Sequence, residues 1–239
     1  MILYKQLSEH PRKHFVNKKK RAIVLGGTGA TGKQLIKQLL ESKYWEQITS
    51  IGRRPVLNGD THEKLQDIII DSFDQISSTK NIWPGHDIFF NCIGTTRSRA
   101  GGAKEFVNIE LGISEKAAQM ASKALIPHAS IISAMGANPN QWSTDWIHPL
   151  LYTKTMGLKE QTLITNSFER ISIFRPGMLV RMMHKPTWID RIMISTNIAL
   201  KVDVLASAMI RDGECNQTKK DSQPFVYIGN RCIKVSKKL

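Results

Sequence analysis

Four glycines within seven residues constrain this chain more than any other feature of its sequence. The loop Gly26-Gly27-Thr28-Gly29-Ala30-Thr31-Gly32 follows an apolar run at 22–25 and precedes residues 33–40, whose apolar side chains recur at helical spacing. Glycines at this density serve a very tight turn or a close approach of the backbone to a ligand. Free N–H groups and the dipole of a helix starting here would face one point and form an anion site. The spacing G-x-x-G-x-x-G is related to the dinucleotide fingerprint, so we expect a bound dinucleotide, with a ligand-free strand-to-helix turn as the alternative.

Short apolar runs alternate with helical patterns through the rest of the 239-residue chain. Strands are predicted at residues 22–25, 48–51, 67–71, 87–92, 129–133 and 171–174. Helices are predicted at residues 33–40, 103–123 and 150–168. Residues 67–71 have the composition of a fully buried strand. The alternation predicts a single α/β domain built on a doubly wound parallel sheet, in which ligands bind outside the carboxyl ends of the strands.

The residues after the second predicted strand indicate which dinucleotide is bound. NAD-binding chains place an acid roughly 20 residues past the glycine loop, where it binds the ribose 2′-hydroxyl. Here Arg53 lies 21 residues after Gly32, Arg54 follows it, and residues 51–54 contain no acid. Two guanidinium groups suit the 2′-phosphate of NADP, to which they can donate paired hydrogen bonds. We therefore expect NADP(H); the alternative is an ordinary exposed basic pair before Pro55.

The net charge of +14 is concentrated at the two ends of the chain. Residues 1–21 hold seven Lys or Arg against one acid, and residues 211–239 hold seven against three. We divide the chain into a basic N-terminal segment, 1–21, and a dinucleotide-binding domain, 22–239, which ends in a small substrate-side region and a basic tail. Because the charge forms no stripe across the domain, we expect the ends to be solvated or to dock on a protein partner or large complex. Nucleic acid bound by the ends is the alternative.

The sequence argues against several other classes of protein and site. No apolar run approaches the ~20 residues of a transmembrane helix, and residues 1–21 lack the apolar core of a secretory signal. Cys92, Cys215 and Cys232 have neither a disulfide nor a zinc-site spacing, so we expect a reducing compartment and no metal. Residues 1–21 are basic and nearly free of acids, as in a mitochondrial presequence, although they are poor in Ser and Arg. We expect a mitochondrial protein, with the cytoplasm as the alternative.

Five short segments carry a resemblance that covers nearly the whole chain. They are Gly26–Gly32, Ile51-Gly52-Arg53-Arg54, Gly94-Thr95-Thr96-Arg97, Phe174-Arg175-Pro176-Gly177 and Asn230-Arg231-Cys232-Ile233. Together they resemble the HIV-Tat-interacting oxidoreductase group of the atypical short-chain dehydrogenases/reductases. Residues 1–21 are also similar to a leading segment that proteins of this group keep. The resemblance implies an NADPH-binding Rossmann fold with a short-chain dehydrogenase active site.

The resemblance also implies which residues contact the cofactor. Loop residues 28–31 would meet the pyrophosphate and the nearby ribose, and Arg53 and Arg54 would meet the 2′-phosphate. Asp71 would lie near the adenine, and Ile93 and Gly94 would pass under the cofactor. The full set of expected cofactor-binding residues is Gly26, Thr28, Gly29, Ala30, Thr31, Gly32, Arg53, Arg54, Asp71, Ile93, Gly94, Tyr152 and Pro176.

The expected catalytic pair departs from the family pattern. Short-chain dehydrogenases use Tyr-x-x-x-Lys, in which both side chains share a helix face and the ammonium lowers the pKa of a hydroxyl that titrates near ~10. Tyr152 is present, but Met156 occupies the position of the lysine. Lys154 points to another helix face and Lys159 lies nearly two turns away, so neither replaces that lysine easily. A packing tyrosine at a helix start is the alternative role for Tyr152.

A serine after the fifth predicted strand would orient the substrate carbonyl in this family. Ser133 is the candidate, but Ala134 follows it where the family tends to have a second serine. We predict an NADP(H)-binding, short-chain-dehydrogenase-like protein whose hydride transfer is impaired or lost, acting as a cofactor-bound structural or regulatory subunit. The alternative is an active NADPH-dependent oxidoreductase of a small carbonyl substrate, using Tyr152 alone or with a water or Lys154.

A few further residues stand outside any motif. His128 and His148 have no partner at triad or metal spacing and are expected to be structural or surface groups. Cys92, in an apolar strand, is expected to be a small core residue. Three tryptophans flank the expected substrate side and would form either a hydrophobic pocket or a partner-facing patch: Trp142, Trp146 and Trp188.

Overall fold

A computed structural model of the chain describes residues 19–180, 194, 196–215 and 223–237. Its main sheet has seven strands, all parallel, in the order β3-β2-β1-β4-β5-β6-β9. The strands are Lys20–Leu25 (β1), Trp45–Gly52 (β2), Leu65–Ile69 (β3), Ile88–Asn91 (β4), His128–Ile132 (β5), Arg170–Arg175 (β6) and Phe225–Ile228 (β9). Because β1 pairs with β2 on one side and β4 on the other, the strand order reverses at β1. The carboxyl end of β1 is therefore a topological switch point, where doubly wound sheets bind ligands.

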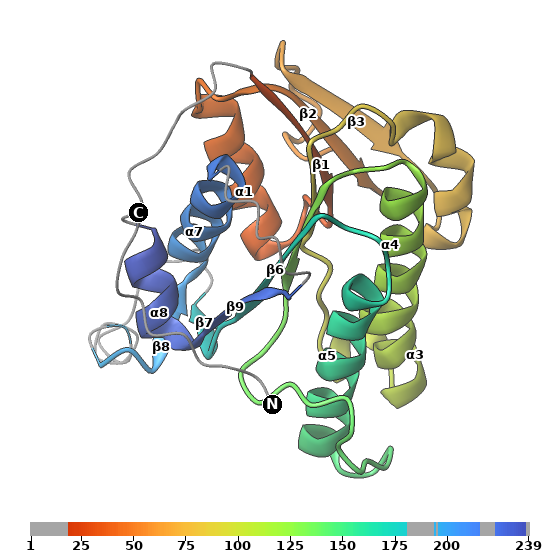
Figure 1. The fold of residues 1–239 in the computed structure, drawn as a ribbon. Coiled ribbons are helices and arrows are strands. Elements are labelled where there is room, and N and C mark those ends of the chain that lie inside the picture. Colours follow the sequence, from red (N-terminus) through yellow and green to blue (C-terminus); the bar gives the residue numbers. More distant parts are fainter. Residues whose placement is uncertain (1–18, 181–193, 195, 216–222, 238–239) are drawn as a thin grey trace.

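Helices cover both faces of this sheet (Figure 1). The first face is covered by α1 (Ala30–Glu41), α7 (Val202–Glu214) and α8 (Gly229–Ser236). The second is covered by the 3-10 helix η1 (Phe73–Ile82), α4 (Ile113–Lys123) and α5 (His148–Ile164). Two short strands, β7 (Met178–Val180) and β8 (Ala199–Lys201), form a small parallel sheet of their own. Neighbouring residues of β1 point to opposite faces, so Val24 belongs to the first apolar core and Ile23 to the second.

The long helix predicted at 103–123 is present but not uniform. It consists of α3 (Ala103–Val107), a π-helical turn called η2 (Asn108–Gly112) and α4. A short helix, α2 (Arg97–Ala100), precedes it. Single π-helical turns are frequent at functional sites, and this one carries the buried acid Glu110.

All six predicted strands are present, with bounds that differ by up to three residues: β2, for example, begins at Trp45 and not at residue 48. β1 begins two residues earlier than predicted, at Lys20. The prediction that residues 67–71 form a fully buried strand is wrong, because β3 is an edge strand that pairs with β2 alone, and Ile69 is 51% exposed. An apolar composition therefore did not reveal the position of this strand in the sheet. The helix predicted to end at residue 168 ends at Ile164.

The C-terminal residues contribute more to the fold than their basic composition indicated. Residues 225–236, assigned from the sequence to the substrate-side region and basic tail, form the seventh strand β9 and the helix α8. Tyr227 of β9 stacks on Phe174 of β6 with ring centroids 4.6 Å apart. Ile233 of α8 is fully buried in the first core. This helix therefore packs on the sheet through an apolar side chain, although the segment is basic in composition.

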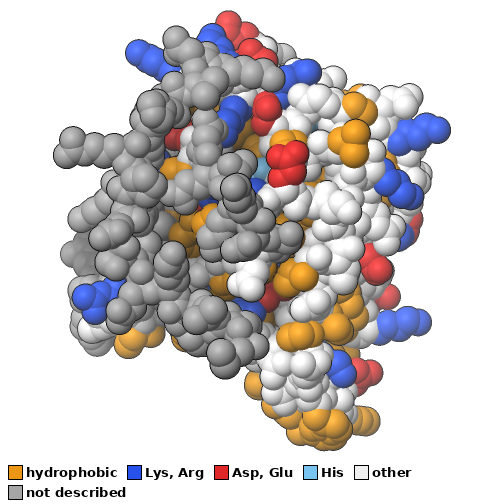
Figure 2. Space-filling model, in the orientation of Figure 1, with side chains coloured by type: hydrophobic (Ala, Val, Ile, Leu, Met, Phe, Trp, Pro, Cys, Tyr) orange, Lys and Arg blue, Asp and Glu red, His pale blue; other side chains and the backbone are white. Residues whose placement is uncertain are grey.

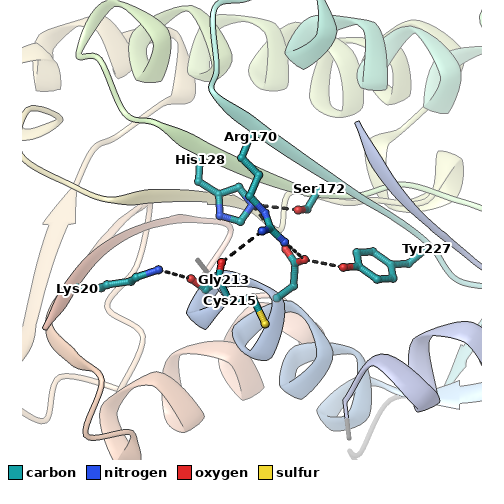
Figure 3. Close-up of polar contacts among 8 residues, drawn as sticks. Lys20, His128, Arg170, Ser172, Gly213, Cys215 and Tyr227 are labelled. Carbon is teal, nitrogen blue, oxygen red and sulfur yellow. Dashed lines mark hydrogen bonds and ion pairs between the residues drawn. The ribbon is translucent and has the colours of Figure 1, made fainter. Parts of the chain in front are cut away.

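A buried ion cluster ties the starts of β5 and β6 to α7 and β9 (Figure 3). Arg170 forms an ion pair with Asp212, and Asp212 Oδ1 also accepts a hydrogen bond from the Tyr227 hydroxyl at 2.6 Å. The Nε2 of His128 lies 2.9 Å from Ser172 Oγ and 3.5 Å from Asp212 Oδ2. Burial lowers the pKa of His128 to about 3, so the ring is neutral near pH 7. The cluster lies at the opposite end of the sheet from the glycine loop and has a structural role.

Within the described ranges, no helix is long and apolar enough to span a bilayer. Nor do three or more His, Cys, Asp or Glu side chains gather there in an arrangement that would hold a metal ion.

Candidate cofactor site and catalytic centre

The glycine loop turns between β1 and α1 against the end of β4. Gly26 has a φ of +82°, and a Cβ on this residue would lie 2.7 Å from the carbonyl group of Cys92. A Cβ on Gly32 would lie 2.2 Å from the carbonyl oxygen of Gly26, and the Gly29 N–H donates to the same oxygen at 3.0 Å. Side chains at these two glycines would overlap backbone atoms. The turn is therefore as tight as its sequence predicts.

The start of α1 fits the pyrophosphate of a dinucleotide. The N-cap residue, Gly29, makes no side-chain hydrogen bond to the helix, and the first turn holds no acid. The opening N–H groups of a helix have no partners within it, and the positive end of the helix dipole lies there. Gly29 is exposed and Thr28 and Ala30 are half-buried, so the loop is open to a ligand. An anion placed here would meet donors that the fold leaves available.

Arg53 and Arg54 follow directly on β2 and are exposed. The neighbouring Val56 packs against the glycine loop: its Cγ1 lies 2.8 Å from the place of a Cβ on Gly27. The Arg53 guanidinium lies over the ring of Phe73, 5.8 Å from its centroid. The fold thus brings both arginines to the loop in which the dinucleotide is expected.

A buried ion pair supports the segment that follows β4. Lys159 Nζ donates to the Ile93 carbonyl oxygen at 2.7 Å and to Glu110 Oε2 at 2.9 Å. The other oxygen of Glu110 accepts the Thr95 N–H at 2.6 Å. The lysine and glutamate side chains are only 1% and 4% exposed. Contacts from α5 and from the π-helical turn therefore fix the segment that is expected to pass under the cofactor.

Tyr152 and Met156 lie one turn apart on α5, in a small apolar cluster with Phe106 and Ala134. Met156 is 3% exposed. Burial raises the pKa of the Tyr152 hydroxyl, and the negative charge of Glu110 raises it further. A lysine at position 156 would have the opposite effect. The surroundings of Tyr152 therefore favour the protonated hydroxyl over the phenolate.

Ser133 lies after β5, as predicted, but its hydroxyl is bonded to a carboxylate of the protein. Ser133 Oγ donates to Glu160 Oε1 at 2.5 Å. Arg175 donates two hydrogen bonds to the same carboxylate, at 2.7 and 2.5 Å. Because Ser133 and Glu160 are both buried, the hydroxyl proton is already bonded within the protein and is not available to a substrate carbonyl in this arrangement.

The other predicted site residues lie along the carboxyl edge of the sheet. Asp71 is exposed shortly after β3, and Gly94 is exposed after β4. Pro176 is buried after β6, where its carbonyl oxygen accepts the Met135 N–H at 3.0 Å. The fold thus gathers the predicted residues at the ends of successive strands. Their contacts with a cofactor stay a prediction.

Sequence reasoning missed Glu110 and Glu160, and it gave Lys159 no role. Each is a charged residue within a helical pattern, which is usually a solvated position. One signal was present for Lys159: seven residues after Tyr152, it lies on the same face of α5. Nothing in the sequence indicated that Glu110 lies in a π-helical turn.

The residues outside any motif have mostly structural positions. Cys92 is buried at the end of β4, and burial raises the pKa of its thiol to about 12, as expected of a core residue and not of a nucleophile. The His148 ring packs edge-on against Phe106 with centroids 5.4 Å apart, and 6.0 Å from Tyr152.

The loop between β5 and α5 exposes hydrophobic side chains. Trp142 is 67% exposed and Trp146 is 90% exposed. Figure 2 shows hydrophobic side chains gathered at the lower end of the molecule, below α5. This exposure favours a patch over a pocket wall. Trp188 lies outside the described residues.

Comparison with known proteins identifies the domain. Residues 26–188 match a protein family described as NAD(P)H-binding. The chain belongs to this family. The matched range starts at the glycine loop and includes Arg53, Arg54, Tyr152 and Met156.

Two relatives support the resemblance to the HIV-Tat-interacting oxidoreductase group. Protein HTATIP2 of Rattus norvegicus is 31% identical over 170 residues, which are 71% of this chain and 66% of that protein. A protein of Debaryomyces hansenii named FMP52, mitochondrial, is 34% identical over 167 residues, 66% of either chain. The chain thus matches slightly under two thirds of the length of these curated relatives.

The fold agrees with that of a solved enzyme that binds NAD+. The Bordetella bronchiseptica enzyme WbmH, solved in complex with NAD+, superposes with a TM-score of 0.64 at 14% identity, covering 87% of this chain and 74% of that one. The chain is therefore an NAD(P)H-binding domain with a Rossmann-like fold, and its cofactor is a nicotinamide dinucleotide.

Proposed function

We propose that this protein binds NADP(H) and has lost efficient hydride transfer, so that it acts as a cofactor-bound structural or regulatory subunit. The observation that carries the proposal is Met156 in the place of the catalytic lysine, together with a raised pKa at Tyr152. The glycine loop keeps its tight turn. Cofactor binding and catalysis are thus separated in this chain.

The missing lysine charge is large enough to change the acidity of Tyr152. An ammonium ~4 Å from a phenolate, at an effective dielectric of 20, stabilises it by roughly 4 kcal/mol. Such an interaction would lower the phenol pKa by about 3 units. Met156 offers no charge, and Glu110 acts in the unfavourable direction. Tyr152 is therefore a poor proton donor and acceptor for a carbonyl substrate near pH 7.

The preference for NADP(H) over NAD(H) rests on Arg53 and Arg54. Both are exposed beside the glycine loop, and no acid stands at the end of β2 to bind a free 2′-hydroxyl. A phosphate on the ribose would neutralise both guanidinium groups and accept several of their N–H donors.

The second candidate function is an active NADPH-dependent reductase of a small carbonyl substrate. It is favoured by the retention of Tyr152, which lies next to His148 at the edge of an open pocket. In this reading a water or Lys154 would assist the tyrosine. Replacement of Tyr152 by Phe would then abolish turnover.

We further propose a mitochondrial location, since the yeast relatives are named as mitochondrial proteins. The basic chain ends would bind an acidic protein partner or a large complex. Nucleic acid is the alternative ligand for these ends. Its binding would weaken steeply with salt, as would a charge contact with an acidic protein, and would be lost when both ends are trimmed.

Titration of the full chain with NADPH and NADH tests the proposal. We expect micromolar or tighter NADPH binding, and a loss of about 100-fold or more in NADPH affinity for R53A/R54A, because this variant removes two charge-assisted contacts of roughly 1.5–3 kcal/mol each. NADH affinity should change little. The matched control is Lys37→Ala, which removes an exposed charge from α1 away from its first turn.

Turnover is measured on the same samples with a panel of aldehydes and ketones. We expect NADPH to be oxidised far more slowly than ~1 s⁻¹, the lower end of the turnover rates of ordinary enzymes. Ordinary turnover by the wild-type chain would overturn the loss of catalysis. Equal affinity for NADPH and NADH would overturn the assignment of NADP(H).

A further inference from the structure

An open pocket lies between the segment after β4 and the start of α5. Its volume is about 710 Å³, much of it open to solvent. We call it the Arg97 pocket; it is lined by Thr96, Arg97, Ser98, Gly101, Gly102 and His148. The pocket includes part of the family segment Gly94-Thr95-Thr96-Arg97, of which the expected cofactor contacts account only for the first glycine.

The side chains that line the Arg97 pocket suit an anion. None of the six lining residues is acidic, and Arg97 supplies a permanent positive charge. Its guanidinium donates from Nη1 to the backbone oxygen of Asp145 at 2.6 Å, which leaves most of its five N–H donors for a ligand. Thr96 and Ser98 add hydroxyl groups to the same wall.

The pocket is held in place by backbone contacts. Both Gly101 and Gly102 donate their N–H groups to the Arg97 carbonyl oxygen, at 3.1 and 3.2 Å. Gly101 has a φ of +87°, and a Cβ on either glycine would meet nothing within 4 Å. The glycines are therefore needed for the turn and leave the pocket open, while the turn fixes the backbone from which Arg97 extends.

His148 connects this pocket to the candidate catalytic centre. Its ring lies 6.0 Å from the Tyr152 ring, one helical turn further along α5. His148 Nδ1 is buried and finds no hydrogen-bond partner among the described residues. Because this nitrogen has no accessible surface, a ligand in the pocket would contact the rest of the imidazole ring and not Nδ1.

We propose that the Arg97 pocket binds a small organic anion, with its carboxylate or phosphate on the Arg97 guanidinium and the rest of the molecule against His148. The inference rests on the proposed function in one respect: it makes this anion the second ligand of the cofactor-bound protein. A subunit that has lost hydride transfer can still bind such a molecule next to Tyr152.

The test follows backbone amide signals of the full chain by NMR during titration with inorganic phosphate and, separately, malonate. We expect saturable shifts at the amides of Gly101, Gly102 and Ser98, with a dissociation constant of about 10 mM or tighter for at least one probe. The probe that binds distinguishes a phosphate from a carboxylate ligand. Neutral malonamide is the control for size and shape.

Variants make the test specific to the pocket. Arg97→Gln should weaken binding at least tenfold, whereas Arg99→Gln, an exposed arginine on α2 that does not line the pocket, should bind as the wild type does. His148→Phe keeps an aromatic ring and removes the nitrogens, so it provides a second variant if Arg97→Gln fails to fold. It should also weaken binding.

Three results would overturn the proposal: no saturable shift with either anion, equal shifts with malonamide, or unchanged binding in Arg97→Gln. NADPH affinity is measured on the same samples. Anion binding without NADPH binding would refute the proposed function but not the proposed anion site. NADPH binding without anion binding would refute the pocket alone.

Discussion

Met156 and Tyr152 determine what chemistry this chain can perform. In the family pattern, the tyrosine hydroxyl works because a lysine one turn away stabilises its ionised form. Here the same place holds an apolar side chain packed among Phe106 and Ala134. Burial and Glu110 both favour the protonated hydroxyl. One substitution therefore changes the role of the tyrosine while leaving its position on α5 intact.

Met156→Lys tests this interpretation directly. The new ammonium should lower the pKa of Tyr152 and raise NADPH-dependent carbonyl reduction by roughly 10²-fold or more, the usual contribution of acid–base catalysis. Burial of the charge should reduce the free energy of unfolding by a few kcal/mol. The measurements are NADPH oxidation with a carbonyl panel and thermal unfolding.

The matched control is Y152F/M156K, which should return the rate to that of the wild-type chain. Retained activity in this double variant would show that the gain does not pass through the tyrosine. No gain in a folded Met156→Lys variant would mean that the site lacks more than its lysine, and Ser133, already bonded to Glu160, would be the next residue to change.

At the scale of the elements, α5 is anchored to its neighbours by polar as well as apolar contacts. Lys159 links it to the π-helical turn through Glu110 and to the end of β4 through the Ile93 carbonyl oxygen. Gly157, on the same helix, lets the loop before α5 approach closely: a Cβ there would lie 2.2 Å from Pro139 N. These two contacts position the helix that carries Tyr152.

Lys159→Met should cost about 3–5 kcal/mol of unfolding free energy, because it leaves the Glu110 carboxylate buried without its cation. NADPH affinity should also fall, since the segment after β4 loses a contact. The double variant E110Q/K159M removes both charges and keeps an acceptor for the Thr95 N–H, so part of the stability should return. Chemical denaturation measures the unfolding free energy of the wild-type chain and of both variants. A double variant less stable than Lys159→Met would contradict the pairing of Lys159 with Glu110.

Gly157→Ala should destabilise the protein by about 2 kcal/mol or more, against the ~1 kcal/mol that alanine gains over glycine inside a helix. The reason is overlap with backbone and ring atoms of Pro139, which cannot move independently. Gly213→Ala in α7 is the matched control. There a Cβ would lie 3.1 Å from Ile88 Cδ1 and 3.2 Å from Phe90 Cζ, so side-chain ends and not backbone atoms would have to shift, by a smaller amount. Chemical denaturation measures the unfolding free energy of both variants. An equal loss in the two would refute the steric explanation.

The elements also show how far sequence reasoning reaches. Local periodicity was sufficient for the six strands and for the helix at 103–123, because burial of one face imposes that periodicity. It could not reveal the π-helical turn at Glu110, which depends on tertiary packing. Nor could it reveal that Ser133 bonds to Glu160, since the two residues are 27 positions apart. The positions of the site residues were predictable, but their partners were not.

At the scale of the whole molecule, the last elements of the chain complete the sheet and are secured at its far end. β9 was missed because it is four residues long and stands in a basic segment. Its Tyr227 and the Asp212 of α7 belong to the same buried ion cluster as Arg170 and His128 (Figure 3). Stability of the complete fold is therefore coupled to the protonation of this cluster.

The cluster predicts that stability falls as the pH is lowered from about 6.5. Burial lowers the pKa of His128 to about 3. The Asp212 charge acts to raise this pKa, and the charges of Arg170 and Lys20 act to lower it. An unfolded chain binds a proton to this histidine below its ordinary pKa of about 6.5, whereas the folded chain does so only near 3. Each pH unit within that window therefore costs roughly 1.4 kcal/mol of unfolding free energy. Buried His86, whose pKa is also lowered by burial, adds to the loss.

Denaturation at a series of pH values between 7 and 4.5 measures this slope. His128→Gln should flatten it, because glutamine can bond to Ser172 without taking up a proton. Ser172→Ala is the matched control: it removes the hydrogen bond to the His128 ring and lowers stability at every pH, but keeps the titrating group and so keeps the slope. Asp212 does not interfere: burial acts to raise its pKa, but the Arg170 charge and the hydrogen bonds of Ser172 and Tyr227 together lower it, so this carboxyl stays ionised over the measured range. A slope that survives in H86Q/H128Q would assign the acid sensitivity to groups outside the two buried histidines.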